Sequence, residues 1–284
     1  MFVRESKMSD STPYVVAQEL LTPGDPPVFE EANVESRDFV FFICDHASRR
    51  IPQRLGTLGL TEEEIGTHIG WDIGAADLAR MLASSRDASL VLSGYSRLVI
   101  DCNRPLESPG SIPDESAGIA IPGNIALSAA DMAARRDVLF RPYHAAIAAL
   151  LDRRRHAGIP TLLFSMHSFT PNYPGQQRPW HMDLAYNRDS RLAKLLLEQD
   201  WGRALVVGDN VPYKVEDDSD YSIPIHGERR GLPHVLVEIR QDTLADAAGI
   251  ASWAERFDHL LRRLRPSLER LATDSLSSAN VVKS

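Results

Sequence analysis

Two histidines of this chain follow apolar runs that are typical of buried strands. His46 comes after the run at 38–45, and His167 comes after the run at 161–166. In open α/β sheets, ligands bind beyond the carboxyl ends of the strands. Two neutral imidazoles and one carboxylate would form a three-ligand zinc site with a fourth position left for water. The sequence therefore predicts a metal site that contains both histidines, although each one alone is also compatible with a buried core histidine.

The third metal ligand is expected to be Asp72, in the motif GWDIG. This residue follows a break in a helical segment and precedes the start of a second helix. An N-cap is therefore its alternative role. His68 lies four residues earlier and is the alternative ligand, unless it lies on an exposed helix face.

Glu238 is the candidate general base. It lies in the apolar run at 234–242, which indicates a strand that continues into a loop. A carboxylate at that place can take a proton from a metal-bound water, whose pKa falls toward roughly 7. His226, ahead of the loop ERRGLP, is a second catalytic candidate that could stabilise an oxyanion or bind substrate.

Polar residues after another apolar run provide the candidate substrate-binding groups. Asn103 and Arg104 end the strand-like run at 97–103, and the planar fork of an arginine suits a substrate carboxylate. Arg97 and Arg229 complete the predicted substrate-binding set. The alternatives are a structural ion pair for Arg104 and a solvated loop charge for Arg229.

Apolar runs alternate with helical periodicity along the chain. Such alternation predicts an α/β fold with three layers, in which a mostly parallel or mixed central sheet has helices on both faces. Residues 1–37 are expected to form a partly ordered N-terminal arm, 38–273 a single domain, and 274–284 a frayed tail. The predicted strands are 38–45, 88–94, 97–103, 161–167, 204–210 and 234–242, and the predicted helices are 61–85 with a break near Gly70, 127–158, 190–199 and 251–272.

The composition excludes several classes of function. The formal net charge is −8, and the longest basic run is the three arginines at 153–155, so no nucleic-acid partner is expected. No apolar stretch approaches the roughly 18 residues of a membrane span, and no signal peptide is recognised. The two cysteines, Cys44 and Cys102, imply no disulfide framework. A cytoplasmic protein that acts on a small molecule is expected, and the sequence does not indicate an oligomeric state.

The chain resembles the N-formylglutamate amidohydrolase family in five motifs, FFICDHASRRIP, HIGWDIGAADLARML, SRLVIDCNRP, SMHSF and RGLPHVLVEIRQD, which follow the family's order. That family is similar in fold to the zinc carboxypeptidases and the aspartoacylases, so the resemblance implies a zinc-carboxypeptidase-like fold. His167 matches the carboxypeptidase zinc histidine that precedes a serine. Asn103 with Arg104 matches the pair that holds the substrate carboxylate, and Glu238 matches the general base.

One carboxypeptidase motif is broken in this chain. Arg49 takes the place of the glutamate in H-x-x-E, so the missing carboxylate ligand must come from elsewhere, and Asp72 is the candidate. The resemblance implies that one zinc ion, held by His46, Asp72 and His167, serves hydrolysis of the amide bond of an N-formyl or N-acyl amino acid. The alternatives are a small-peptide carboxypeptidase, another amidase on the same fold, and a non-catalytic protein whose degenerate site binds an acidic ligand.

Overall fold

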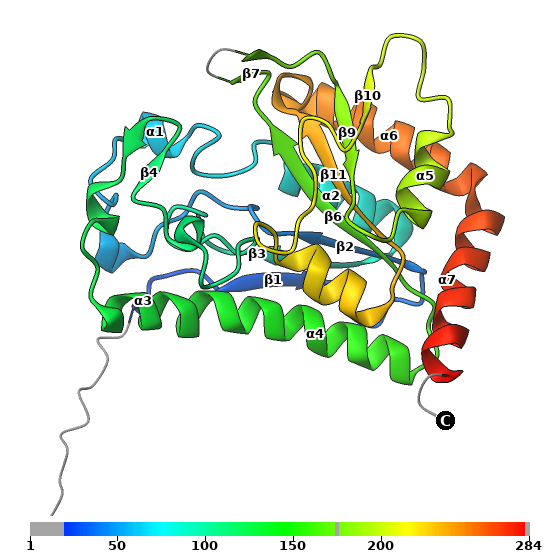
Figure 1. Ribbon diagram of the computed structural model, residues 1–284, viewed down its shortest axis with the longest axis horizontal. Helices are drawn as coiled ribbons and strands as arrows, with labels where there is room; N and C mark the ends of the chain where they lie inside the picture. The colour runs from blue at the N-terminus through cyan, green and yellow to red at the C-terminus, as the bar shows by residue number, and fades with distance from the viewer. Residues whose placement is uncertain (1–19, 174–175, 282–284) are drawn as a thin grey trace, which may run out of the picture.

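The computed structural model describes residues 20–173 and 176–281. Its centre is a seven-stranded sheet with the order β1 (Phe29–Ala32), β3 (Ser89–Ser93), β2 (Val40–Cys44), β6 (Leu162–Phe169), β11 (His234–Arg240), β9 (Met182–Ala185) and β10 (Val207–Asp209) (Figure 1). Strands β3, β2, β6 and β11 run parallel, whereas β1 and β9 run antiparallel to their neighbours in that central group. The predicted mixed, mostly parallel sheet is confirmed.

Helices cover both faces of this sheet, as predicted. Helix α4 (Arg141–His156) packs on one face, and α2 (Ala75–Arg86), α5 (Arg191–Leu197), α6 (Ala247–Arg263) and α7 (Arg265–Val281) pack on the other side (Figure 1). No helix among the described residues is long and apolar enough to cross a membrane.

Short helices, turns and ribbons connect these elements. The short helices are α1 (Glu62–Ile65) and α3 (Ala129–Arg135), and the π-helical turns are η4 (Arg136–Phe140) and η5 (Ile223–Gly227). The 3-10 turns are η1 (Gln53–Leu55), η2 (Pro109–Ser111), η3 (Pro122–Asn124), η6 (Glu228–Arg230) and η7 (Gln241–Leu244), and the two ribbons are β4 (Glu115–Ser116) with β5 (Ile119–Ala120) and β7 (Asn172–Tyr173) with β8 (Gln176–Gln177).

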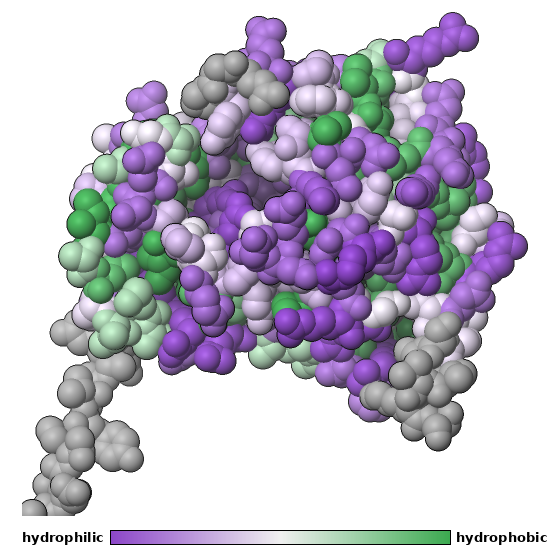
Figure 2. All heavy atoms as spheres, viewed as in Figure 1, coloured by the Kyte–Doolittle hydropathy of each residue, from purple (hydrophilic) through white to green (hydrophobic). Residues whose placement is uncertain are grey.

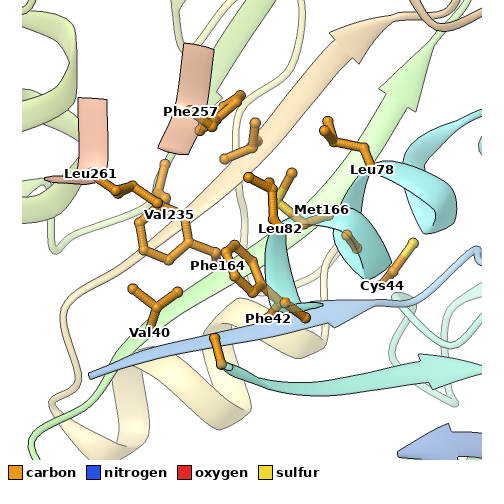
Figure 3. Packing of buried hydrophobic residues seen from close by; sticks show 14 of the residues in the cluster. Val40, Phe42, Cys44, Leu78, Leu82, Phe164, Met166, Val235, Phe257 and Leu261 are labelled. Atoms are coloured by element: carbon orange, nitrogen blue, oxygen red, sulfur yellow. The ribbon is translucent and has the colours of Figure 1, made fainter. Parts of the chain in front are cut away.

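Alternation along the strands sends apolar side chains into two separate cores. Val40 and Phe42 of β2, together with Phe164 and Met166 of β6, pack in the core that contains α2 and α6 (Figure 3). The intervening residues of both strands face α4. Because the sheet is covered on both faces, these strands appear in the sequence as continuous apolar runs rather than alternating ones.

The face that packs on α4 changes from apolar to polar toward the carboxyl ends of the strands. On β6, Leu163 is followed at two-residue intervals by Ser165 and His167, and on β11, Leu236 is followed by Glu238. All five residues are buried. The parallel register of β6 and β11 pairs His167 with Glu238. The strand register thereby positions the predicted metal ligand next to the predicted base.

The segment at 97–103 is not a strand, and that prediction is wrong. Its apolar residues 98–100 are buried in a third core that also contains Phe140. Burial outside the sheet, rather than strand pairing, explains why this run is apolar. Asp101 and Arg104 consequently project from a buried loop and not from a strand end.

Interruptions divide the predicted helical segments. The break predicted near Gly70 within 61–85 is confirmed, because this segment forms the short α1 and then α2. Between them, a Cβ on Gly70 would lie 2.1 Å from the carbonyl oxygen of Ile65, so this close turn requires glycine. The predicted helix at 251–272 consists of α6 and α7, which meet at Leu264.

The two ends of the chain are more ordered than predicted where they are described. Residues 29–32 of the predicted arm form β1 at the edge of the sheet. Helix α7 continues through residues 274–281, and the Ser275 hydroxyl donates a hydrogen bond of 2.6 Å to the Gly231 carbonyl. The predictions for residues 1–19 and 282–284 fall outside the described residues.

Candidate functional site

His46, Asp72 and His167 form one buried group near the carboxyl ends of β2 and β6. One ligand atom from each residue lies within 4.8 Å of the other two. Asp72 Oδ2 is 2.8 Å from His167 Nδ1 and 3.4 Å from His46 Nδ1. The structure therefore brings together the three residues of the predicted metal site, whereas metal binding by them stays a prediction.

Backbone contacts hold Asp72 between β2 and α2. Its amide donates to the His46 carbonyl at 3.0 Å, and its carbonyl accepts from the Ala75 amide at 3.2 Å. The N-cap position of α2 is occupied by Gly74, so the alternative role of Asp72 as N-cap is wrong. The Asp72 carboxylate instead points at the two histidines and accepts from the Ser168 amide at 3.2 Å.

The other ring nitrogen of each histidine lies within hydrogen-bonding distance of a further carboxylate. Asp45 Oδ2 is 3.2 Å from His167 Nε2, and Asp101 Oδ1 is 2.7 Å from His46 Nε2. A proton on each Nε2 leaves Nδ1 as the atom that faces Asp72. Carboxylates in this position orient metal-binding histidines and raise their basicity. Neither carboxylate is among the predicted site residues, although Asp45 adjoins His46 in the sequence.

Asp45 is buried, and hydrogen bonds saturate its carboxylate. Its Oδ1 accepts from the Tyr143 and Ser222 hydroxyls at 2.9 and 2.6 Å, and the Ser165 hydroxyl lies 3.2 Å from Oδ2. Burial alone would raise the pKa of Asp45, but the hydrogen bond and charge of His167 outweigh burial and hold it well below its ordinary value. The pKa of His167 is likewise raised well above its ordinary value by Asp45 and Asp72, against the opposing effect of burial.

Glu238 faces the same group from β11. The strand registers pair it with His167 on one side and with Asp183 on the other. Burial raises the pKa of Glu238, His167 opposes the rise, and the charges of Asp72 and Asp183 add to it. Among the described residues, no hydrogen-bond partner reaches the buried Glu238 Oε2. A carboxylate oxygen left free beside this group is placed to accept a proton, as a general base must.

A cavity of about 450 Å³ opens beside this group. Figure 2 shows a hollow, bordered by hydrophilic residues, near the centre of the face in view. His68 lines the cavity but does not belong to the group that could hold a metal ion. The lining includes the three candidate ligands, the predicted residues Glu238, Arg97, Asn103 and Arg104, and a set without a predicted role that includes Tyr173, Tyr213, Lys214, Ser219 and Asp220.

Arg97 and Asn103 line the cavity but use their side chains within the protein. Arg97 Nε and Nη2 donate to Asp101 Oδ2 at 3.0 and 2.7 Å. Asn103 Nδ2 donates to Asp220 Oδ1 at 3.0 Å, and Asn103 Oδ1 accepts from the amides of residues 221 and 222 at 3.2 and 3.0 Å. These contacts favour positioning roles, because Arg97 holds a carboxylate that supports His46 and Asn103 fixes one wall of the cavity.

The Arg104 guanidinium forms fewer hydrogen bonds within the protein than the Arg97 guanidinium does. Its Nη1 donates to the Ser219 carbonyl, and its Nε lies 4.0 Å from Asp101 Oδ2. The Arg104 side chain is 33% exposed, against 26% for Arg97. The alternative ion pair with Asp101 is long, and Arg104 lines the cavity.

His226 and Arg229 are not among the described residues that line the cavity. Arg229 is exposed on η6. His226 is buried in η5, where its Nε2 lies 3.0 Å from His144 Nδ1, and His144 Nε2 lies 2.8 Å from the Cys102 carbonyl. Because a carbonyl only accepts, His144 Nε2 carries a proton and His144 Nδ1 accepts from His226. The position of His226 therefore does not support its predicted catalytic role.

Acid should destabilise the protein through this histidine pair. Burial lowers the pKa of His144 to about 4 and the pKa of His226 to about 3, from an ordinary value of 6.5. Between pH 6.5 and 4 the unfolded chain therefore binds more protons than the folded protein does. The free energy of unfolding consequently falls as the pH falls. We expect a loss of roughly 3 kcal/mol from His144 alone across this range.

Urea unfolding between pH 7 and 4.5 measures this loss. The variant His144→Gln should show a flatter dependence of the free energy of unfolding on pH than the wild type. The surface variant His156→Gln serves as the control, because His156 is exposed at the end of α4. Identical slopes for the wild type and His144→Gln would contradict the prediction.

Tyr213 and Lys214 line the cavity without having been indicated by any apolar run or motif. They belong to the segment between β10 and η5, which the sequence analysis treats only as a connection. The available sequence signal is their position directly after Pro212, and a proline in a turn is common without any functional role.

Comparisons with known proteins agree with this fold. A family model described as N-formylglutamate amidohydrolase matches residues 39–245. The crystal structure of a gene product from Agrobacterium tumefaciens is 35% identical, with a TM-score of 0.80 over 92% of this chain and 99% of that one. The N-formylglutamate amidohydrolase from Ralstonia eutropha is similar in fold at 18% identity, with a TM-score of 0.59 over 89% of this chain and 98% of that one. A search of curated protein sequences gave no match.

The α/β fold and the matched family define the class of protein, which is a hydrolase that acts on carbon–nitrogen bonds other than peptide bonds. Within this class, the chain belongs to the N-formylglutamate amidohydrolase family. The resemblance that the five sequence motifs indicate is thereby confirmed. Membership of this family implies a small-molecule substrate.

Proposed function

We propose that this protein hydrolyses the amide bond of N-formyl or N-acyl amino acids of the N-formylglutamate type, with one zinc ion held by His46, Asp72 and His167. The observation that carries the proposal is the buried His–Asp–His group with its ligand atoms within 4.8 Å of one another. Two imidazole nitrogens and a carboxylate oxygen are a donor set used by zinc hydrolases, which keep a further position open. The carboxylates on both Nε2 atoms fit the same use.

The residues around the group divide the chemistry among them. A zinc ion held by His46, Asp72 and His167 would polarise the substrate carbonyl and lower the pKa of the attacking water. Glu238 takes the proton of the attacking water and delivers it to the nitrogen of the leaving amine. Arg104 holds a carboxylate of the substrate. All of these residues lie within 38–273, which we propose is a single amidohydrolase domain.

Metal and product analyses of the purified protein test the proposal. Protein prepared without chelator is expected to contain stoichiometric zinc and to release formate from N-formylglutamate. Removal of the metal should abolish this activity, and addition of zinc should restore it. A panel of N-formyl, N-acetyl and peptide substrates identifies the acyl group and the amino acid. Hydrolysis that survives complete metal removal, or binding of N-formylglutamate without turnover, would contradict the proposal.

Arg104→Lys should weaken the binding of substrates that carry a free carboxylate. A lysine retains the charge but loses the planar fork that binds a carboxylate through two hydrogen bonds. Hydrogen bonds to charged groups contribute roughly 1.5–3 kcal/mol, which corresponds to a factor of about 10 to 150 in affinity. We therefore expect KM for N-formyl amino acids to rise within this range and KM for their neutral carboxamides to change little.

Kinetics with matched acid and carboxamide substrates measure this difference. The control is Arg136→Lys, because Arg136 forms an exposed ion pair with its neighbour Asp137. Equal losses for both substrates would show that Arg104 acts through Asp101 or Ser219 and does not bind the substrate carboxylate.

A further inference from the structure

Arg178 connects two segments at the edge of the cavity. It follows the ribbon β7–β8, and its guanidinium lies over the rings of Tyr173 and Tyr213, at 4.7 and 4.9 Å from the ring centroids. The guanidinium also lies over the ring of Phe169, at the end of β6, at 5.8 Å from the ring centroid. Arg178 is only 7% exposed. Contacts between a desolvated guanidinium and aromatic faces are attractive, so the aromatic rings hold the cation in place.

The Arg178 cation also forms a hydrogen bond with one of these tyrosines. Arg178 Nη1 donates to Tyr213 Oη at 2.7 Å. A phenol oxygen that accepts this bond still has its own proton to donate, and it must donate in another direction. Tyr213 lines the cavity, whereas Arg178 is not among the described residues of the lining. The free proton of Tyr213 is therefore available to a ligand in the cavity.

The backbone of Tyr213 is held from the opposite side by Asp183. The Tyr213 amide lies 3.4 Å from Asp183 Oδ2, and the Val211 amide donates to Asp183 Oδ1 at 3.0 Å. Asp183 is fully buried on β9, where the strand register pairs it with Glu238. One carboxylate thereby fixes the Tyr213 backbone relative to the strand that carries the proposed general base.

The phenol of Tyr213 stays protonated at neutral pH. Tyr213 is 37% exposed, and partial desolvation, followed by the negative charge of Glu238, raises its pKa, although Arg178 opposes this rise. Tyr213 lines the same cavity as Glu238 and the three candidate metal ligands, so it borders the reacting end of that cavity. Arg104, by contrast, lies near Ser219 and Asp101.

We propose that Tyr213 is a catalytic residue whose hydroxyl donates a hydrogen bond to the amide carbonyl oxygen as this oxygen becomes anionic, and that Arg178 is the residue that positions the hydroxyl. The inference rests on the proposed amide hydrolysis. Donors aimed at an oxygen that gains charge in the transition state lower the barrier more than they strengthen substrate binding. The role differs from that of Arg104, which binds a group of the substrate that does not react.

The reaction step balances without any change in Tyr213. The oxygen of water forms a bond to the carbonyl carbon, and the π electron pair of the carbonyl moves onto its oxygen. The proton of the water goes to Glu238. When the carbon–nitrogen bond breaks, the electron pair on oxygen restores the double bond, and Glu238 gives the proton to the amine nitrogen. Tyr213 keeps its proton throughout and acts only as a hydrogen-bond donor.

Four variants of the full chain test the inference with N-formylglutamate as the substrate. Tyr213→Phe should lower kcat by about 10²- to 10³-fold, the usual effect of removing one such donor, with little change in KM. Arg178→Met, whose side chain can still pack on the aromatic rings, should lower kcat by a smaller factor. The double variant should be no worse than Tyr213→Phe, because Arg178 acts through the hydroxyl that is already missing. Tyr186→Phe is the matched control, because the Tyr186 hydroxyl bonds to Asp209 at 2.8 Å, outside the cavity lining.

Each outcome supports or overturns a part of the inference. Full kcat in Tyr213→Phe would overturn it, and a loss confined to KM would reduce Tyr213 to a group that binds the ground state. Independent, multiplicative losses in the double variant would overturn the positioning role of Arg178. A wild-type protein inactive on every N-formyl amino acid would overturn the proposed function and this inference with it. An active wild type with an equally active Tyr213→Phe variant would overturn the inference alone.

Discussion

Replacing Glu238 by glutamine is expected to lower turnover by about 10²- to 10⁴-fold without loss of bound metal. Glutamine has the shape of glutamate but cannot take a proton from water. Glu238 lies beside His167 in the strand register, yet it is outside the His–Asp–His group that could hold the metal. Its Oε2 makes no hydrogen bond to any described residue, so the substitution breaks no contact at that atom.

The measurement is kcat for N-formylglutamate together with the zinc content of each variant. Glu30→Gln is the matched control, because Glu30 lies on the edge strand β1 and forms an exposed ion pair with Arg80. Loss of zinc in Glu238→Gln would show that Glu238 is a metal ligand. Full turnover in this variant would remove Glu238 from the mechanism.

The pairing of His167 with Glu238 illustrates how much of the site the sequence contains. His167 follows one apolar run and Glu238 lies toward the end of another, and parallel strands bring their carboxyl ends to the same edge of a sheet. The period of two along β6 and β11 then places both side chains on one face. The alternation along each strand and the alignment of parallel strand ends are sufficient to predict this pairing. The sheet then fixes the distance between residues that are paired on neighbouring strands.

Contacts between distant segments could not be predicted in the same way. The hydroxyls that surround Asp45 belong to residues that are 98, 120 and 177 positions away in the sequence. The stacking of Arg178 on Tyr213 likewise joins two loops that carry no regular periodicity. Such pairs are determined by packing of the whole chain, and the types of the residues alone do not reveal them.

The prediction of a strand at 97–103 was wrong for a related reason. An apolar run indicates burial, and burial within a sheet cannot be distinguished from burial in another core by composition alone. Residues 98–100 pack in the third core, and Asp101 is nevertheless brought to His46. The polar residues Asn103 and Arg104 that follow this run thus line the cavity, although the predicted element was wrong. Asn103, predicted to bind substrate, lines the cavity and forms hydrogen bonds within its wall, so its role in substrate binding stays a prediction.

Asp72→Asn should lower the affinity for zinc by more than about 100-fold, which is the upper end of the effect of altering groups that merely support a metal ligand. Asp72 is the only carboxylate in the group that could hold a metal among the described residues. Asparagine keeps the shape and can still approach both imidazoles, but it replaces an anionic oxygen ligand by a neutral amide that binds zinc more weakly. Activity should fall with the bound metal and should recover in part at high zinc concentration.

Metal titration of the purified variants tests this prediction and separates Asp72 from the alternative ligand. Asp77→Asn is the control, because its carboxylate is 58% exposed in the first turn of α2 and pairs with Arg80. His68→Gln should also retain zinc, since His68 borders the cavity without belonging to the His–Asp–His group. Normal zinc binding by Asp72→Asn together with loss of zinc in His68→Gln would show that His68, and not Asp72, is the third metal ligand. Normal binding by both variants would leave a metal site that depends on the two remaining histidines and on a carboxylate other than Asp72.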